Sequence, residues 1–439
     1  MRVLRAFVGC LGTCLLLAAA PALGQAVQPL TLDAETTADE LHVTFLGLDA
    51  RVLRQSVSVG GHVAWRTDAA LDVHKPPWDA TPVQLHAELL LTPTGDPLQL
   101  RVVRGRGGQT RLRLSAGGKV VWKQQWLAGD NAKLDEKLPL RADQILTALP
   151  LPRRAFGKKA LAFYYGWYGT PQGAAGKWVH WLPERSDRGA AHTPALGYYD
   201  SADVGVIAQQ VAWAKQAGLD GFVLSWWNDP QERRVLERLL TAAEGKGFAV
   251  SVYLERVTGV ADLRKQLQEI HEVFGKHPAW LRAGDRPVVF LYGRVLEQVG
   301  LAGLREVLPQ FPLFVIGDNL EQPFMEVLDG EHTYASVGGP EYCRSHLLSM
   351  QRAARLWDKL LVATVQPGYD DSHIRAPGGI QRRDDGKFYA SLWAMAGLGD
   401  WVIVTSWNEW HEGSEIEPSQ EDGDRWLRET QRWIEAWKR

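Results

Sequence analysis

Residues 206 to 255 read VIAQQVAWAKQAGLDGFVLSWWNDPQERRVLERLLTAAEGKGFAVSVYLE, and this stretch decides the fold class. It contains a helical pattern (206–218), a short apolar run (221–227), a second helical pattern (232–247) and a second apolar run (248–255). Short apolar runs bounded by turn residues are typical of buried strands, and longer periodic segments are typical of helices. Strands that alternate with helices predict a parallel sheet covered by those helices, which is an α/β fold.

The same alternation extends from residue 160 to the end of the chain. The predicted strands are 160–168, 221–227, 248–255, 287–293, 313–319, 332–336, 361–370 and 401–407. Eight strands with intervening helices over roughly 280 residues match a (β/α)8 TIM-type barrel in number and size. A doubly wound open sheet is the structural rival. The turn after the first strand, YYGWYGTPQG, lacks the glycine pattern of the phosphate-binding turn that such a sheet usually carries.

The residues before the barrel follow a different pattern. Residues 26–150 alternate apolar and polar side chains with a period of two, and glycine, proline and aspartate interrupt them at short intervals. This pattern predicts an amino-terminal antiparallel β-sandwich, followed by a linker at 151–159. The sandwich could bind polysaccharide through Trp65, Trp122 or Trp126, or it could brace the barrel. We favour bracing, because each tryptophan falls within a strand pattern and can fill the sandwich core.

The first residues, MRVLRAFVGCLGTCLLLAAAPALG, have the features of a secretory signal peptide. Two arginines precede an apolar run, and small residues at Ala22 and Gly24 provide a cleavage site. The apolar run is too short for a comfortable transmembrane helix, and no later segment supplies one. We therefore expect residues 1–24 to be removed and the mature protein to be exported to the periplasm or the extracellular space.

The charge and cysteine content exclude several classes of partner and site. A formal net charge of −2 leaves no basic surface for nucleic acid. Cys343 is the only cysteine outside the signal peptide, so we expect no internal disulfide in the mature chain. Cys343, in PEYCRSHLL, could be a catalytic thiol, but we favour a small buried apolar side chain. The sequence leaves the oligomeric state open.

Chemistry in a (β/α)8 barrel gathers at the carboxyl ends of the strands. Most of the predicted strand ends carry aromatic or acidic residues. These are Tyr164, Tyr165, Trp167, Tyr168, Ser225, Trp226, Trp227, Glu255, Tyr292, Asp318, Asn319, Tyr334, Asp370, Asp371, His373 and Arg375, with His180 in the loop after the first strand. Together they predict a cleft of aromatic faces and hydrogen-bonding groups, which suits a polyhydroxylated sugar ring. Each aromatic residue taken alone could equally be a core residue.

The last predicted strand leads into TSWNEWHEGSEIEPS (405–419), where Glu409 and Glu412 form a pair of carboxyl groups. Hydrolysis of a glycosidic bond needs one carboxylic acid to protonate the departing oxygen and a second carboxylate to assist at the sugar. Trp410 and His411 can shield such a site and raise the pKa of one carboxyl group. We therefore identify Glu409 and Glu412 as the candidate catalytic residues.

The other two glutamates of this segment invite a simpler interpretation. Glu415 and Glu417 approach the final helix, whose amino end favours negative charge, so we expect a solvated acidic loop there. The segment HEGSE lacks the second histidine of the zinc motif H-E-x-x-H. The remaining histidines are scattered, at positions that include His180, His192, His332 and His373. We expect neither a metal site nor a cofactor.

Four motifs together resemble glycoside hydrolase family 99, the endo-α-mannosidases and endo-α-mannanases. They are FYYGWYG with GKWVHW, GLDGFVLSWW, VQPGYDDSHIR and TSWNEWHEGSEIEPS, in the order of that family, and the resemblance covers roughly residues 160–439. It implies a retaining, endo-acting hydrolase of α-mannosidic linkages in a polysaccharide or oligosaccharide, with no metal. It also implies a 1,2-anhydro sugar intermediate. Glu409 would deprotonate the sugar's own 2-hydroxyl, and Glu412 would act as acid and then as base at the leaving group.

The resemblance also implies where the substrate lies. The positions that match the family's cleft are Tyr165, Trp226, Glu255, Tyr334 and Arg375. Their place at or beside the predicted strand ends adds Trp167, His180, Asp371 and Asn408 as candidate substrate-binding residues. The chain departs from the family pattern in three places. It has YYGWYG where another residue often replaces the first glycine, GSEIEPS in place of GTQIEP, and IRAPGG in place of IRPWN. The last departure removes a tryptophan and an asparagine beside Arg375, which affects the identity of the sugar more than the reaction.

The sequence leaves three other interpretations open. The chain could cleave another α-linked polysaccharide, or it could be a carbohydrate-binding protein whose barrel has lost catalysis. The presence of both Glu409 and Glu412 argues against lost catalysis. A metal-dependent hydrolase that uses histidine and aspartate groups is the third reading, and activity that survives a strong chelator would eliminate it.

Overall fold

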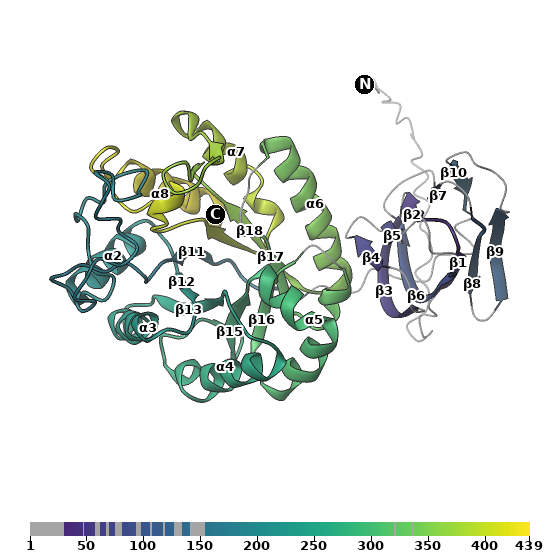
Figure 1. Cartoon of the computed structure of the whole chain (residues 1–439), viewed down its shortest axis with the longest axis horizontal. Helices are drawn as coiled ribbons and strands as arrows, with labels where there is room; N and C mark the ends of the chain where they lie inside the picture. Colours follow the sequence, from purple (N-terminus) through teal and green to yellow (C-terminus); the bar gives the residue numbers. More distant parts are fainter. Residues whose placement is uncertain are drawn as a thin grey trace, which may run out of the picture.

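The computed structural model describes two regions of the chain, an amino-terminal sandwich and a carboxy-terminal barrel (Figure 1). The described residues are 30–46, 48–57, 62–66, 70–74, 81–93, 98–105, 108–116, 119–126, 134–140, 154–319, 322–334 and 338–439. The predicted signal peptide, the start of the predicted linker and the side chain of Trp65 lie outside the described residues.

The amino-terminal region consists of two antiparallel sheets, each of five strands in the described residues. The strands are β1 (Leu30–Thr36), β2 (Glu40–Leu46), β3 (Leu48–Val57), β4 (His62–Arg66), β5 (Ala70–His74), β6 (Val83–Pro93), β7 (Gln99–Arg104), β8 (Thr110–Ala116), β9 (Lys119–Trp126) and β10 (Leu134–Pro139). Their order is β3-β6-β1-β8-β9 in one sheet and β10-β7-β2-β5-β4 in the other. The predicted antiparallel β-sandwich is thus confirmed.

The two-residue period of these strands separates a core face from a solvated face. In β1, for example, Leu30 and Leu32 are buried while Asp33 pairs with Arg113 on the outer face. Trp126 is buried in the sandwich core, and Trp122 packs against that core. Strand β3 also contacts elements of the barrel, the helix α6 (Pro340–Trp357) and the 3₁₀ turn η3 (Gln322–Glu326). This contact agrees with a bracing role for the sandwich.

The carboxy-terminal region is a closed barrel of eight parallel strands in the described part of the chain. These are β11 (Ala160–Tyr164), β12 (Gly221–Trp226), β13 (Ala249–Leu254), β15 (Arg286–Leu291), β16 (Phe314–Asp318), β17 (Gly330–His332), β18 (Leu360–Val365) and β21 (Trp401–Val404). They pair in this order, and the β11–β21 pairing closes the ring. The predicted (β/α)8 barrel is therefore confirmed.

Helices cover the outside of the barrel (Figure 1). They are α2 (Val204–Gln216), α3 (Pro230–Ala243), α4 (Val260–Glu272), α5 (Gly293–Val307), α6, α7 (Lys387–Trp393) and α8 (Arg425–Lys438). None of the helices in the described residues is both long and apolar enough to cross a membrane.

The structure shortens several predicted strands. The first, β11, ends at Tyr164 instead of residue 168, and the eighth, β21, ends at Val404 instead of residue 407. The sixth strand, β17, ends at His332, so Tyr334 follows the strand instead of lying inside it. The seventh strand, β18, ends at Val365, and the rest of the predicted segment enters a short hairpin of β19 (Tyr369–Asp370) and β20 (Ile380–Gln381). In the sixth and seventh strands the side-chain pattern continues beyond the last barrel pairing, so the sequence does not mark the strand end.

Every barrel strand has two buried faces. One points into the barrel, and the other points toward the surrounding helices. In β12, Val223 belongs to the interior of the barrel, whereas Phe222, Leu224 and Trp226 pack toward the surrounding helices. Parallel strands covered on both sides have no polar face that would reveal this alternation in the sequence. Successive side chains of a strand point to opposite faces, so the direction of each side chain at the mouth depends on whether its position in the strand is odd or even.

Candidate active site

The loop after β21 carries both candidate catalytic glutamates to the mouth of the barrel. The backbone N–H of Glu409 donates to Oγ of Ser406 at 2.7 Å, and the chain then makes the 3₁₀ turn η6 (Trp410–Glu412). Gly413 ends this turn with φ of 56°, and a Cβ there would lie 3.0 Å from the Cβ of Ala191. The left-handed conformation favours glycine at this position, and a side chain would be crowded by Ala191 and Asp370.

Trp410 and His411 are buried within the same turn. The indole N–H of Trp410 donates to the hydroxyl of Tyr199 at 3.1 Å, and Nδ1 of His411 lies 2.8 Å from the carbonyl oxygen of Gly189. The two side chains anchor the loop to the segment between β11 and α2, and this packing helps to exclude water from the glutamates beside them.

Glu409 is almost completely buried, with 2% of its surface exposed. Its Oε1 lies 3.2 Å from the backbone N–H of His411 and 3.5 Å from the hydroxyl of Tyr168. Burial raises the pKa of Glu409 well above its usual value, and the nearby charge of Glu412 raises it further.

Glu412 lies among hydroxyl groups and one guanidinium. Its Oε2 accepts a hydrogen bond from the hydroxyl of Tyr334 at 3.0 Å. Its Oε1 lies 3.1 Å from Nη1 of Arg375 and 3.4 Å from the hydroxyl of Tyr369. Each of these donors can exchange a bond to Glu412 for a bond to a sugar oxygen, so the carboxyl group is held without being blocked.

Arg375 is itself held by the β19–β20 hairpin. Its Nη1 lies 2.5 Å from Oδ2 of Asp371 and 2.8 Å from the hydroxyl of Tyr369. Burial tends to raise the pKa of Asp371, but the hydrogen bonds from Arg375 and Tyr369 outweigh it and lower that pKa. Asp371 is buried and acts on the site through Arg375, whereas Arg375 has half of its side chain exposed.

An aromatic wall stands beside the carboxyl pair. The hydroxyl of Tyr165 donates to that of Tyr334 at 2.7 Å. The indole of Trp167 stacks on His180 with ring centroids 4.5 Å apart and planes within 9°. Trp167 is also 4.7 Å from the ring of Tyr165, which joins the stacked pair to the rest of the site. The predicted residues Tyr165, Trp167, His180 and Tyr334 thus lie together.

Glu255 marks the far side of the mouth, directly after β13. Its Oε1 accepts a hydrogen bond from the hydroxyl of Ser225 at 3.0 Å, and burial raises its pKa to about 7. Asp318, at the end of β16, has a pKa raised to about 6 by burial, and the hydroxyl of Tyr253 donates to it at 3.3 Å. Both carboxyl groups are close enough to Glu412 or to each other for their charges to interact.

Two of the predicted binding residues do not face the mouth. Trp226 has 1% of its surface exposed and packs against Phe274 in the layer between strands and helices, where its Nε1 donates to Gln266 at 3.2 Å. The prediction for Trp226 was wrong because alternate residues of β12 point to opposite faces, and Trp226 is one of those that point outward to the helices. The next residue, Trp227, reaches the site instead, and its Nε1 donates to Oγ of Ser225 at 3.1 Å.

Asn408 is fully buried below the pair of glutamates. Its Oδ1 accepts from the backbone N–H of Tyr165 at 2.7 Å, and its Nδ2 donates to the carbonyl oxygen of Tyr165 at 3.0 Å. Asn408 therefore ties the end of β21 to the end of β11. It fixes the aromatic wall in place and has no surface left for a substrate.

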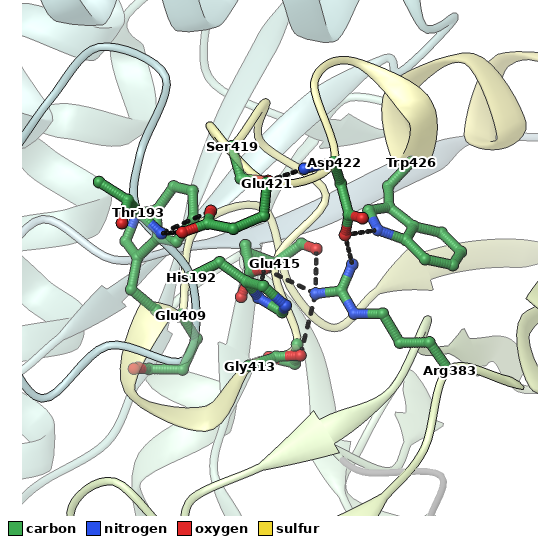
Figure 2. Close-up of polar contacts among 12 residues, drawn as sticks. His192, Thr193, Arg383, Glu409, Gly413, Glu415, Ser419, Glu421, Asp422 and Trp426 are labelled. Carbon is green, nitrogen blue, oxygen red and sulfur yellow. Dashed lines mark hydrogen bonds and ion pairs between the residues drawn. The ribbon is translucent and has the colours of Figure 1, made fainter. Parts of the chain in front are cut away.

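The structure contradicts the expectation of a solvated acidic loop at Glu415 and Glu417, because both are buried. Oε1 of Glu415 lies 2.7 Å from Nδ1 of His192 and 2.6 Å from Nη2 of Arg383 (Figure 2). Glu417 accepts hydrogen bonds from Tyr199 and Gln210, both at 2.8 Å, and burial raises its pKa to about 8. The segment turns back into the protein instead of running along its surface.

Four residues outside the substrate-binding set expected from the sequence complete the site. Tyr168 and Tyr369 contact the two glutamates, and Trp227 and Asp318 lie at strand ends of the mouth. Strand-end position pointed to Tyr168, Trp227 and Asp318, whereas Tyr369 carried no signal beyond its place in VQPGYDDSHIR. Among the residues that the structure describes, no three histidine, cysteine, aspartate or glutamate side chains are grouped to hold a metal ion.

A (β/α)8 barrel with two carboxyl groups at the carboxyl ends of its strands, beside aromatic faces, has the arrangement that hydrolysis of a glycosidic bond requires. The family model of glycosyl hydrolase family 99 matches residues 182–424, and the chain belongs to this family. The protein is thus a glycoside hydrolase with the TIM-barrel catalytic domain of family 99.

Relatives and solved structures agree with this assignment. The chain is 28% identical over 322 residues to the glycoprotein endo-α-1,2-mannosidase of Rattus norvegicus, which covers 58% of this chain and 67% of the relative. It is 27% identical over 343 residues to the enzyme of the same name from Mus musculus, covering 64% and 71%. The structure of the GH99 endo-α-mannosidase from Bacteroides thetaiotaomicron superposes with a TM-score of 0.57 at 26% identity, over 63% of this chain and 96% of that one.

Proposed function

We propose that this protein is an endo-acting hydrolase of α-mannosidic linkages that retains the anomeric configuration. The observation that carries the proposal is the pair Glu409 and Glu412, which one loop presents at the barrel mouth within reach of hydroxyl and guanidinium donors. The names of the family relatives support α-mannosidic linkages, and α-1,2 linkages are the first to test.

In the first step, the carboxylate of Glu409 takes the proton of the sugar's 2-hydroxyl. The freed O2 attacks C1, and the bond from C1 to the departing oxygen breaks. Glu412, as a carboxylic acid, gives its proton to that oxygen. The products of this step are a 1,2-anhydro sugar and a free hydroxyl on the leaving chain, with no covalent bond to the protein.

In the second step, water attacks C1 of the anhydro sugar. The carboxylate of Glu412 takes the proton of the water, and O2 leaves C1 and recovers its proton from Glu409. The carboxyl groups return to their starting states. C1 is inverted twice, so the product keeps the α configuration.

The surroundings of each glutamate suit these roles. Burial raises the pKa of Glu409, so this carboxylate is a stronger base than an ordinary glutamate once it is ionised. Tyr334 and Arg375 hold Glu412 in place at the leaving group. We assign Tyr165, Trp167, His180 and Glu255 to sugar binding, because aromatic faces and buried carboxyl groups provide stacking surfaces and hydrogen bonds.

The direct test is digestion of a panel of defined α-linked polysaccharides, including α-1,2-, α-1,3- and α-1,6-linked mannans, with sizing of the products. We expect short oligosaccharides from internal cleavage of an α-mannan. Steady release of monosaccharide from chain ends would contradict endo action. Cleavage of another α-linked glycan with no action on mannans would reassign the substrate.

Two further measurements test the intermediate. Proton NMR during digestion should show α product first, and prompt β product would point to a single displacement by water. A 2-deoxy analogue should bind the cleft and react very slowly, because it lacks the attacking hydroxyl. Fast turnover of that analogue would remove the anhydro intermediate from the mechanism.

The same proposal includes export after removal of residues 1–24. The arginines, the apolar run and the small residues of this segment support it. Expression of the full chain in a bacterium and mass spectrometry of the periplasmic fraction should give a mature amino terminus near Gln25. Full-length protein confined to the cytoplasm would contradict export.

A further inference from the structure

Arg383 holds the glutamate loop from the side away from the substrate. Its Nη2 lies 3.0 Å from the carbonyl oxygen of Gly413, 3.0 Å from that of Glu415 and 2.6 Å from Oε1 of Glu415. Gly413 directly follows Glu412, so this contact acts on the backbone that carries the proposed acid. Figure 2 shows Arg383 reaching the loop while Glu409 extends away from it.

The guanidinium of Arg383 has little freedom to move. It lies over the ring of Trp426 at 4.7 Å from the centroid, and its Nη1 is 4.0 Å from Oδ2 of Asp422. Only 13% of the side chain is exposed. A planar guanidinium that is stacked and hydrogen-bonded fixes direction as well as charge, which a lysine ammonium does not. Arg383 therefore fixes the position of the loop backbone that it contacts.

Glu415 provides the buried counter-charge that keeps Arg383 in this place. Its side chain is 2% exposed, and a buried carboxylate needs a charged partner. His192 approaches the same oxygen at 2.7 Å. Burial lowers the pKa of His192, but the charge and hydrogen bond of Glu415 outweigh burial and raise that pKa. We name these three residues, Arg383, Glu415 and His192, the rear clamp.

The rear clamp and the front of the site belong to one hairpin. Arg383 follows β20 by two residues, and β20 pairs with β19, which begins at Tyr369. Tyr369 contacts the carboxylate of Glu412 from the front, whereas Arg383 contacts the following backbone from behind. The hairpin thus holds the side chain of Glu412 and the main chain of the next residue, Gly413, in a fixed relation.

We propose that Arg383 is a positioning residue for Glu412, with Glu415 as the counter-charge that holds it in register. The inference rests on the proposed function, in which Glu412 protonates the departing oxygen. Proton transfer requires the carboxyl oxygen within about 3 Å of that oxygen. A displacement of about 1 Å costs roughly 10²-fold in rate, so the loss of the rear clamp should act on the step that uses Glu412.

The activity test compares Arg383→Gln with Arg382→Gln, which removes the same charge from an exposed neighbour. Each variant is assayed on an oligomannoside, whose leaving group needs the acid, and on the matching α-mannosyl fluoride, whose leaving group does not. We expect Arg383→Gln to lower kcat on the oligomannoside by roughly 10- to 100-fold with little change in KM, and to spare the fluoride. Arg382→Gln should match the wild type. Equal losses on both substrates, or none, would overturn the proposal.

A second pair of measurements separates this proposal from folding and from the proposed function. Arg383→Gln leaves Glu415 short of a partner, so the double variant Arg383→Gln/Glu415→Gln removes both charges and should show the same selective loss. Hydrogen exchange needs no substrate: backbone amides of residues 410–415 should exchange at least several-fold faster in Arg383→Gln than in Arg382→Gln. Unchanged exchange there overturns the clamp. A wild type without activity on mannosides would instead remove the proposed function and leave the exchange result to decide the clamp.

Discussion

Glu409 and Glu412 differ from Glu415 and Glu417 in the groups that surround their carboxyl groups. The first two lie at the front of the loop, among donors that a substrate can displace. The other two lie at the back, where Arg383, His192, Tyr199 and Gln210 bind them inside the protein. The four glutamates within nine residues therefore fall into two pairs with different surroundings. Under the proposed function, the front pair transfers protons and the rear pair holds the loop.

The largest effect is expected from Glu409→Gln. The 2-hydroxyl would lose its base whichever group departs, so both an oligomannoside and an α-mannosyl fluoride should react roughly 10²- to 10⁴-fold more slowly. The amide has the shape of the protonated carboxyl group that burial favours, so we expect no loss of melting temperature. Steady-state kinetics on both substrates checks this, and a variant that keeps its fluoride activity would remove Glu409 from the role of base.

Glu412→Gln should slow the reaction of the oligomannoside much more than that of the fluoride. The oligomannoside should lose roughly 10²- to 10⁴-fold, because its alkoxide leaving group needs a proton, whereas the first step on the fluoride should be largely spared. The burst phase on the fluoride measures that step. If Glu412→Gln and Glu409→Gln lose both activities in equal proportion, the two front glutamates do not have separate roles.

The pH dependence of the rate tests whether the charge of Glu412 acts on Glu409. Glu409 must be ionised to act as base, and its raised pKa moves the acid limb of the rate profile above the usual range of a glutamate. The charge of Glu412 is one cause of that rise, so Glu412→Gln should move the acid limb toward lower pH. The profile of kcat/KM on the fluoride from pH 4 to 8 tests this. An acid limb that stays in place, or moves upward, would contradict the electrostatic coupling of the pair.

The smallest effect on activity is expected at the rear, from Glu417→Gln. The pKa of Glu417 is raised to about 8 in the folded protein, so between its unfolded pKa and pH 8 the folded state binds the extra proton. Its contribution to stability is therefore present at low pH and is lost as pH rises through this range. The glutamine side chain cannot ionise. As the pH is raised from 5 to 8, the melting temperature of the variant should therefore increase relative to that of the wild type. Glu237→Gln, at an exposed position of α3, should show no such gain.

The fold class and the position of Glu409 and Glu412 at the barrel mouth could be predicted from the sequence. Period-two and helical patterns depend on local residues, and they were enough for the sandwich and the barrel. The motif at 405–419 places Glu409 and Glu412 just past a strand, and the barrel geometry brings every strand end to one mouth. The roles of the two glutamates came from the family resemblance and stay predictions.

Tertiary structure decided which neighbouring side chain faces which way. Trp226 and Trp227 are adjacent and identical in type, and only the parity of β12 sends the first into the helix layer and the second to the site. Such parity is invisible in a strand with two apolar faces.

The same holds for the rear of the loop. Glu415 looks like a solvated acid until Arg383 and His192 are brought beside it from positions 32 and 223 residues away. Local patterns determined where strands and helices form, because backbone geometry and apolar periodicity act over a few residues. The burial and partners of a charged side chain depend on the packing of distant segments. The local sequence does not determine that packing.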